Sequence, residues 1–120
     1  MIRCAVCGSP ADPIKIDMHR VGVSVIIGWA AFETGLPTPD LIGESRVAKL
    51  VRVRAAIAWV SSVALGKSCP QIGLLLGKRH HTTIMNLLRK AEFLRGRDPA
   101  FVLLTDRLLA RVEQARGDAP

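Results

Sequence analysis

Aromatic side chains are scarce in this 120-residue sequence, which has two Trp, three Phe and no Tyr. A surface that stacks unpaired bases on aromatic rings therefore has little to be built from. Cysteine is scarce as well, because three Cys residues do not make the disulfide framework of a small secreted domain. The apolar stretch at residues 21–32 is shorter than the ~20 residues that a membrane-spanning helix needs, and glycines interrupt it. We therefore expect a cytoplasmic protein with no membrane segment and no export signal.

Basic residues are concentrated in the middle of the chain. The sequence contains 17 Lys and Arg against 10 Asp and Glu, a formal net charge of +7, and its pI is near 10.2. Segment 46–97 holds 11 basic residues and one acidic residue, Glu92, so its net charge is +10, whereas the remainder carries −3. Such a segment favours a polyanionic partner, and the scarcity of aromatic rings favours duplex over single-stranded nucleic acid. We therefore expect a surface for double-stranded DNA in the central segment.

The apolar residues follow a helical period, and no alternating pattern typical of a strand occurs. Cap residues and glycines divide this pattern into separate helices. We expect helices at residues 23–34, 46–65, 68–76 and 98–112, a short helical turn between Thr38 and Gly43, and a helix after Gly77. With 49% hydrophobic residues, the chain can bury one core. The prediction is an all-α domain at residues 21–115, between a tail or small appendage at 1–20 and a polar tail at 116–120.

The short helix at 68–76, the turn at Gly77 and the helix after it have the outline of a helix-turn-helix. Ser68 can cap the first of these helices. The second opens with basic and hydroxyl residues, at the end where backbone amides and the helix dipole favour phosphate and where side chains reach base edges. Two ordinary core helices joined by a glycine would have the same outline, so the shape alone does not decide between the two interpretations.

Two motifs carry a family resemblance. Residues 68–73 read Ser-Cys-Pro-Gln-Ile-Gly, and residues 76–84 read Leu-Gly-Lys-Arg-His-His-Thr-Thr-Ile. With the same spacing, they closely resemble the Ser-x-Pro-Glu-Ile-Gly and Phe-Gly-x-Arg-Asp-His-Thr-Thr-Val signature of the C-terminal DNA-binding domain of DnaA, the bacterial chromosomal replication initiator family. The resemblance covers roughly residues 23–112. It implies a Trp-repressor-like domain that binds DnaA-box-like sites as a monomer, in control of replication initiation or transcription.

The resemblance also implies which residues meet DNA. Arg52 matches an arginine that enters the minor groove, and Arg54 belongs to the same basic segment. Arg79, His81 and Thr82 match positions that read the major groove.

Other contacts are expected at the sugar-phosphate backbone. Thr83, Ser68 and Lys67 match or neighbour backbone-contacting positions. Charge and position on the polar helix face, rather than the resemblance, add Lys78 and Lys90. The full set expected to contact DNA is Arg52, Arg54, Lys67, Ser68, Lys78, Arg79, His80, His81, Thr82, Thr83, Asn86 and Lys90.

The chain departs from the family pattern at three positions. His80 replaces an aspartate, so an acceptor is exchanged for a ring that can donate or accept, and the preferred box is expected to change. Gln71 replaces a glutamate and Leu76 an aromatic residue, and both changes are conservative. The sequence holds no ATPase module, and the Gly-Lys-Ser at 66–68 lacks the earlier glycine of a phosphate-binding loop, since position 61 is Ser. We expect no ATP binding and no cofactor.

Two alternatives remain open at this point. The chain could be an adaptor whose apolar first and last helices bind a replication or transcription protein, with only electrostatic affinity for DNA. It could also be a zinc-linked regulator, since Cys4 and Cys7 form half of a zinc knuckle that His19, with Asp17, could complete. No second Cys pair accompanies them, so we predict no bound metal. Three His and a few scattered acids do not assemble into a catalytic constellation, so no enzymatic activity is predicted. A phage or prophage origin would suit such a protein.

Overall fold

The structure is a computed structural model and describes residues 22–117. Within that range the chain forms helices and no strand, so the all-α prediction is confirmed. The six helices are α1 (Val23–Thr34), α2 (Thr38–Ile42), α3 (Ala48–Leu65), α4 (Cys69–Leu75), α5 (His81–Arg95) and α6 (Pro99–Gly117). None of these helices combines the length and the apolar character needed to cross a bilayer. The predicted appendage at residues 1–20 lies outside the described residues.

Helix α3 is the centre of the fold and contacts all five of the other helices. The sequence predicts one apolar face along it, and Val53, Ile57 and Val60 on that face are buried. Ala55 and Ala58 on the opposite side are fully buried too, because α1, α5 and α6 all pack against this helix. A helix that is surrounded in this way needs small side chains where its neighbours approach closely.

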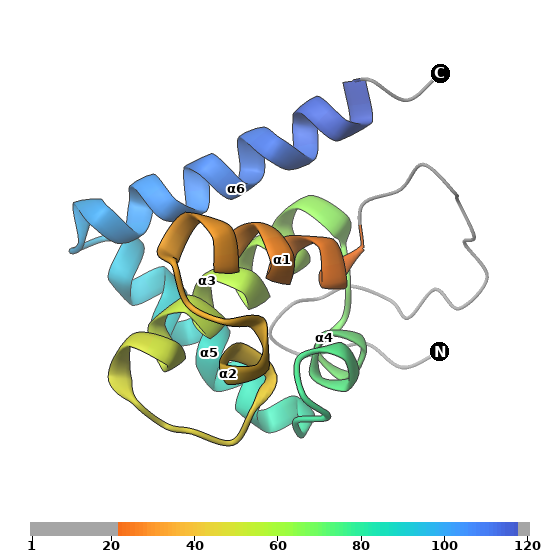
Figure 1. The fold of residues 1–120 in the computed structure, drawn as a ribbon, viewed down its shortest axis with the longest axis vertical. Helices are drawn as coiled ribbons and strands as arrows, with labels where there is room; N and C mark the ends of the chain where they lie inside the picture. The colour runs from red at the N-terminus through yellow and green to blue at the C-terminus, as the bar shows by residue number, and fades with distance from the viewer. Residues whose placement is uncertain (1–21, 118–120) are drawn as a thin grey trace.

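Helix α6 lies across one end of the molecule, and α2 and the α4–α5 turn lie at the other end (Figure 1). It contacts α1, α3 and α5, and among the described elements it makes no contact with α2 or α4. Phe101 and Leu108 are buried in this contact. Glu33 of α1 also accepts a hydrogen bond from Arg111 Nη2 at 2.8 Å, which ties the two helices together at the surface.

Several helix ends differ from the prediction. Helix α6 continues from the predicted end near Val112 to Gly117, because neither proline nor glycine interrupts it after Pro99. Helix α2 begins at Thr38, and its cap position belongs to Pro37. Helix α3 begins at Ala48, two residues later than predicted, because the preceding loop is extended and held by side-chain hydrogen bonds.

The helix-turn-helix begins with a capping box. The hydroxyl oxygen of Ser68 accepts a hydrogen bond from the backbone amide of Gln71, and the side-chain oxygen of Gln71 accepts one from the backbone amide of Ser68 at 2.9 Å. The predicted cap is therefore confirmed, and Gln71 does what a glutamate would do at this position.

Two glycines shape the turn between α4 and α5. Gly77 has φ +83°, and a Cβ there would collide with the carbonyl oxygen of Ile42. A Cβ on Gly73 would collide with the carbonyl oxygen of Arg79, whose amide donates a hydrogen bond to the Gly73 carbonyl at 2.7 Å. The turn is therefore closely packed against both α4 and the end of α2.

Candidate nucleic-acid interface

Helix α5 has one buried side and one exposed polar side. The apolar residues that repeat along it are buried, namely Ile84, Leu87, Leu88 and Ala91. The polar residues of its first two turns are exposed, namely His81, Thr82, Thr83 and Asn86. This arrangement matches the predicted division between core and polar face, and it leaves a row of hydrogen-bonding side chains free to meet a partner.

His80 is the N-cap of α5. Its Nδ1 accepts a hydrogen bond from the backbone amide of Thr82 at 3.2 Å and lies 3.1 Å from the Thr82 hydroxyl oxygen. The His80 and His81 ring centroids are 4.3 Å apart, and both residues are exposed. The sequence indicates His80 as a DNA residue but not as a cap, because histidine is not among the residues that usually occupy this position.

Lys78 and Arg79 lie in the turn before α5 rather than in its first turn. Lys78 is exposed and has φ +55°, the left-handed conformation. Arg79 is partly buried, and its Nη2 donates a hydrogen bond to the carbonyl oxygen of Gly43 in the α2–α3 loop. Burial lowers the pKa of Arg79, and the charge of Glu44 opposes this shift. Arg79 therefore binds the α2–α3 loop, and its side chain does not lie beside His81 on the exposed side of α5.

A hollow of about 720 Å³ lies between the α2–α3 loop and α5. Its lining residues are Glu44, Arg46, Val51, Arg54, Arg79, Thr83, Asn86 and Leu87. Arg46 is exposed and faces the same space as Thr83 and Asn86. The sequence analysis counts Arg46 only as part of the basic segment, since no motif position marks it.

Arg54 requires a correction. It is predicted to contact DNA, but it is 4% exposed, and its guanidinium donates hydrogen bonds to four backbone carbonyls. The acceptors lie in α2 and the α2–α3 loop: Leu41 and Asp40 at 2.7 Å, Gly43 at 3.0 Å and Ser45 at 2.5 Å. Burial, followed by the nearby charge of Arg79, lowers the pKa of Arg54, and Asp40 opposes the shift. Arg54 is a structural residue that shapes the loop.

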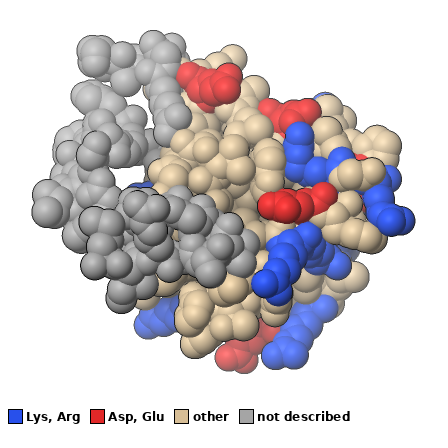
Figure 2. Space-filling model, turned by 180° about the vertical axis from the view of Figure 1, so that it is seen from behind, with Lys and Arg blue, Asp and Glu red and all other residues tan. Residues whose placement is uncertain are grey.

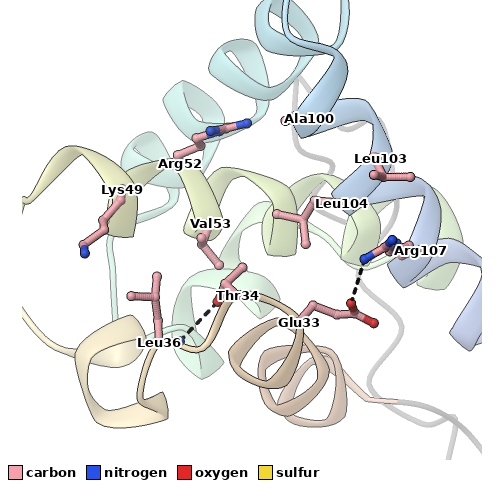
Figure 3. A pocket seen from close by; sticks show the side chains of 10 residues that line it. All are labelled: Glu33, Thr34, Leu36, Lys49, Arg52, Val53, Ala100, Leu103, Leu104 and Arg107. Atoms are coloured by element: carbon pink, nitrogen blue, oxygen red, sulfur yellow. Dashed lines mark hydrogen bonds and ion pairs between the residues drawn. The ribbon is translucent and has the colours of Figure 1, made fainter.

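Arg52 is half-exposed and held against the start of α6. Its Nη2 pairs with Asp98 Oδ2 at 2.7 Å, and its guanidinium lies 5.8 Å from the Phe101 ring centroid. Figure 3 shows the side chain extending from α3 toward the beginning of α6. Its Nε is buried and has no hydrogen-bond partner among residues 22–117. A minor-groove contact by Arg52 therefore has to compete with Asp98.

The predicted phosphate contacts separate into buried and accessible residues. Ser68 is 2% exposed, and its hydroxyl is engaged with Gln71 in the capping box, so that hydroxyl is not free to donate to a phosphate. Lys67 is partly exposed, and Lys90 is exposed. Both lysines keep the accessibility that a phosphate contact needs.

The family model for the bacterial dnaA protein helix-turn-helix matches residues 23–91. The chain belongs to this DnaA helix-turn-helix family. The chromosomal replication initiator protein DnaA of Caulobacter sp. (strain K31) is 37% identical over 86 residues, which are 72% of this chain and 18% of that protein. DnaA of Bradyrhizobium sp. (strain ORS 278) is 32% identical over 94 residues, 76% of this chain and 18% of that protein. The chain thus spans less than a fifth of the length of these DnaA relatives.

The departures from the DnaA pattern fit the fold. Leu76, in place of an aromatic residue, is fully buried in the core. Gln71 completes the capping box, and His80 takes over the cap of α5. The helix-turn-helix of this DnaA family member is therefore built without the two acidic side chains of the family pattern.

Basic side chains of this DnaA-type domain are visible on the face in Figure 2. Lys and Arg lie on the side that grey atoms do not cover and along the lower edge, with Asp and Glu among them, and most of the centre is uncharged. Among residues 22–117, no group of three or more His, Cys, Asp or Glu could hold a metal ion. The zinc candidates Cys4, Cys7, Asp17 and His19 lie outside the described residues.

A separate pocket of about 350 Å³ lies between α1, α3 and α6 (Figure 3). Glu33 and Arg107 form an ion pair of 3.4 Å at its edge. Its lining contains no His, Cys or Ser, and the hydroxyl of Thr34 donates to the Ala30 carbonyl at 2.7 Å.

Proposed function

We propose that this chain binds double-stranded DNA sequence-specifically, at sites related to the boxes of the replication initiator, in control of replication initiation or transcription. The observation that carries this proposal is the exposed first turn of α5, with His81, Thr82 and Thr83 presented behind a glycine-shaped turn. An α-helix about 10–12 Å in diameter fits a major groove about 12 Å wide. The same turn is the end of the helix where backbone amides attract phosphate.

Basic residues of the protein on both sides of α5 would contact the phosphates of the DNA backbone. Lys78 and Lys90 are exposed, and Arg46 lines the hollow beside Thr83 and Asn86. A phosphate strand that passes the α2–α3 loop would meet Arg46 while α5 occupies the groove. These contacts position the protein, and the bases are read by the side chains of α5.

Arg52 would contact a neighbouring minor groove. Its partner Asp98 follows the C-terminal end of α5, a 15-residue helix that is about 22 Å long, so Arg52 is paired at the end of α5 away from its first turn. Half a turn of duplex DNA is about 17 Å, which is a similar distance. One domain could therefore contact a major and an adjacent minor groove, provided that Arg52 leaves Asp98.

The experiment measures the affinity of variants for an initiator-type box duplex at fixed salt by fluorescence anisotropy. Thr82→Ala and Arg52→Ala are each expected to weaken binding about tenfold, or about 1.4 kcal/mol. Arg107→Ala is the matched control for Arg52, because Arg107 also pairs with a single carboxylate, Glu33, but projects from α6, outside the helix-turn-helix. Unchanged affinity of both Thr82→Ala and Arg52→Ala would contradict the proposed contacts.

A second candidate function is a protein-interaction adaptor, favoured by exposed apolar side chains on the first and last helices. Phe32 of α1 is 78% exposed, and Leu103 of α6 is 52% exposed. In that case DNA binding would be electrostatic only and would fall with salt equally for box and scrambled duplexes. Retention of a box preference at higher salt would favour sequence-specific binding instead.

A further inference from the structure

We propose that His80 determines specificity by presenting a hydrogen-bond donor to the major groove, so that it favours guanine over cytosine where an aspartate would favour cytosine. This inference rests on the proposed function and adds to it the chemistry of one base pair. It is carried by the hydrogen bond that caps α5.

The cap determines which nitrogen of the His80 ring carries the proton. The backbone amide of Thr82 lies 3.2 Å from Nδ1 and can only donate, so Nδ1 has to accept. A neutral imidazole with an accepting Nδ1 carries its hydrogen on Nε2. The capping bond therefore makes Nε2 a donor.

The donor is accessible and fixed in direction. His80 is exposed, and no residue in the described part of the chain forms a hydrogen bond with its Nε2. Turning the ring over would break the bond to Thr82, and the neighbouring His81 ring at 4.3 Å packs beside it. The Nε2 hydrogen thus lies at the exposed end of α5 that the proposed function places in the groove.

The bases respond oppositely to a donor and to an acceptor at this point. Guanine presents two acceptors in the major groove, O6 and N7, whereas cytosine presents an amino donor. A donor on His80 pairs with guanine but leaves both groups unsatisfied against cytosine. An aspartate, the residue of the family pattern, is an acceptor and can take a hydrogen bond from the cytosine amino group. Replacement of that aspartate by His80 therefore inverts the hydrogen-bonding requirement at one base pair.

The test compares the full chain with His80→Asp and His80→Asn. Each protein is titrated against an initiator-type box duplex and against duplexes in which every base pair is replaced in turn by the other three. The wild-type protein is expected to favour guanine at one position by about tenfold over cytosine, and His80→Asp is expected to reverse that preference. At the other positions of the box, the order of preference among the four bases should be the same in both proteins.

The two variants differ in what they offer the base, but both can cap α5. Asp and Asn are among the best N-cap residues, so the fold should be kept, and circular dichroism checks this. Asn can cap with its carbonyl oxygen and direct its amide donors outward. His80→Asn is therefore expected to retain the wild-type preference for a base with an acceptor, which a merely structural role would not predict.

The outcomes separate this inference from the proposed function. Identical base preferences in wild type and His80→Asp, with a box preference retained in both, would overturn the role of His80 alone. Equal binding of all duplexes, including a scrambled one, would overturn the proposed function and the role of His80 with it. Imidazole nitrogen NMR gives an independent readout, since a proton on Nδ1 instead of Nε2 would contradict the inference without reference to DNA.

Discussion

Replacement of Arg54 by methionine tests whether this residue holds the loop or contacts DNA. Methionine keeps an unbranched side chain of similar length in the buried site but has no donor for the carbonyls of Leu41, Asp40, Gly43 and Ser45. The bond to Leu41 is buried, whereas the other three acceptors are partly accessible. The cost of the substitution therefore depends on how many carbonyls lose the arginine donor at a site where water cannot replace it.

The expected loss is about 3 kcal/mol of unfolding free energy. A buried acceptor that loses its partner costs about 1–3 kcal/mol, and each hydrogen bond at a site that water can reach contributes about 0.5–1 kcal/mol. The burial that lowers the pKa of Arg54 also costs free energy in the wild-type protein, and the variant no longer has this cost. The expected loss of stability therefore lies in the lower part of the range to which the two contributions add up. A loss of about 3 kcal/mol corresponds to a fall in Tm of about 12–24 °C for a domain of this size.

Urea denaturation followed by circular dichroism measures this loss. Arg54→Lys should recover little of it, because one ammonium group cannot reach four carbonyls on different sides. The matched control is Arg52→Met two residues away, where an ion pair at the surface should be worth less than about 1 kcal/mol. An Arg54→Met variant within about 0.5 kcal/mol of wild type that nevertheless loses box affinity would refute the structural role.

Three other perturbations test separate parts of the structure. Asp98→Asn keeps a side-chain oxygen for the start of α6 but removes the charge that holds Arg52. The affinity for the box duplex should therefore rise about threefold at low salt. Unchanged affinity would contradict the idea that Asp98 competes with DNA for Arg52. Gly73→Ala should lower the free energy of unfolding by about 1–3 kcal/mol, because the new Cβ collides with the backbone of the turn. Gly28→Ala is the control, because a Cβ there meets no atom within 4 Å, and it should be neutral or stabilising in the same denaturation assay. The pKa of Glu33 lies below its ordinary 4.5 because an arginine of α6 donates to it, so its stabilisation is present above pH 4.5 and is lost as the pH falls through the lowered pKa. Thermal unfolding should show Glu33→Gln less stable than wild type at neutral pH and equally stable in acid, and a difference that persists in acid would contradict this cause.

The helices and their ends were largely predictable because the signals that define them are local. The predicted helices at 23–34 and 46–65 are each followed by a glycine, and these two residues, Gly35 and Gly66, have positive φ, as does Gly77 of the predicted turn. The cap at Ser68 depends on Gln71 three residues later, so both partners are visible in the sequence. The family motif extends this local information across the turn of the helix-turn-helix.

The roles of individual arginines were not predictable from the motif. Arg52 and Arg54 are two residues apart in one basic segment, yet one is half-exposed and the other is buried. The exposure of the two side chains differs because the α2–α3 loop packs against only one side of α3, which is a property of the tertiary structure. For the same reason, the sequence did not indicate that Arg79 would bind the Gly43 carbonyl.

The most direct test of DNA readout compares the wild-type chain on an initiator-type box duplex and on a scrambled duplex of equal composition, by fluorescence anisotropy at several salt concentrations. Sequence-specific readout by α5 predicts a preference for the box of about tenfold or more, about 1.4 kcal/mol, that persists as the salt concentration rises. Equal affinities for the two duplexes that fall together with salt would contradict it, because purely electrostatic binding behaves in that way.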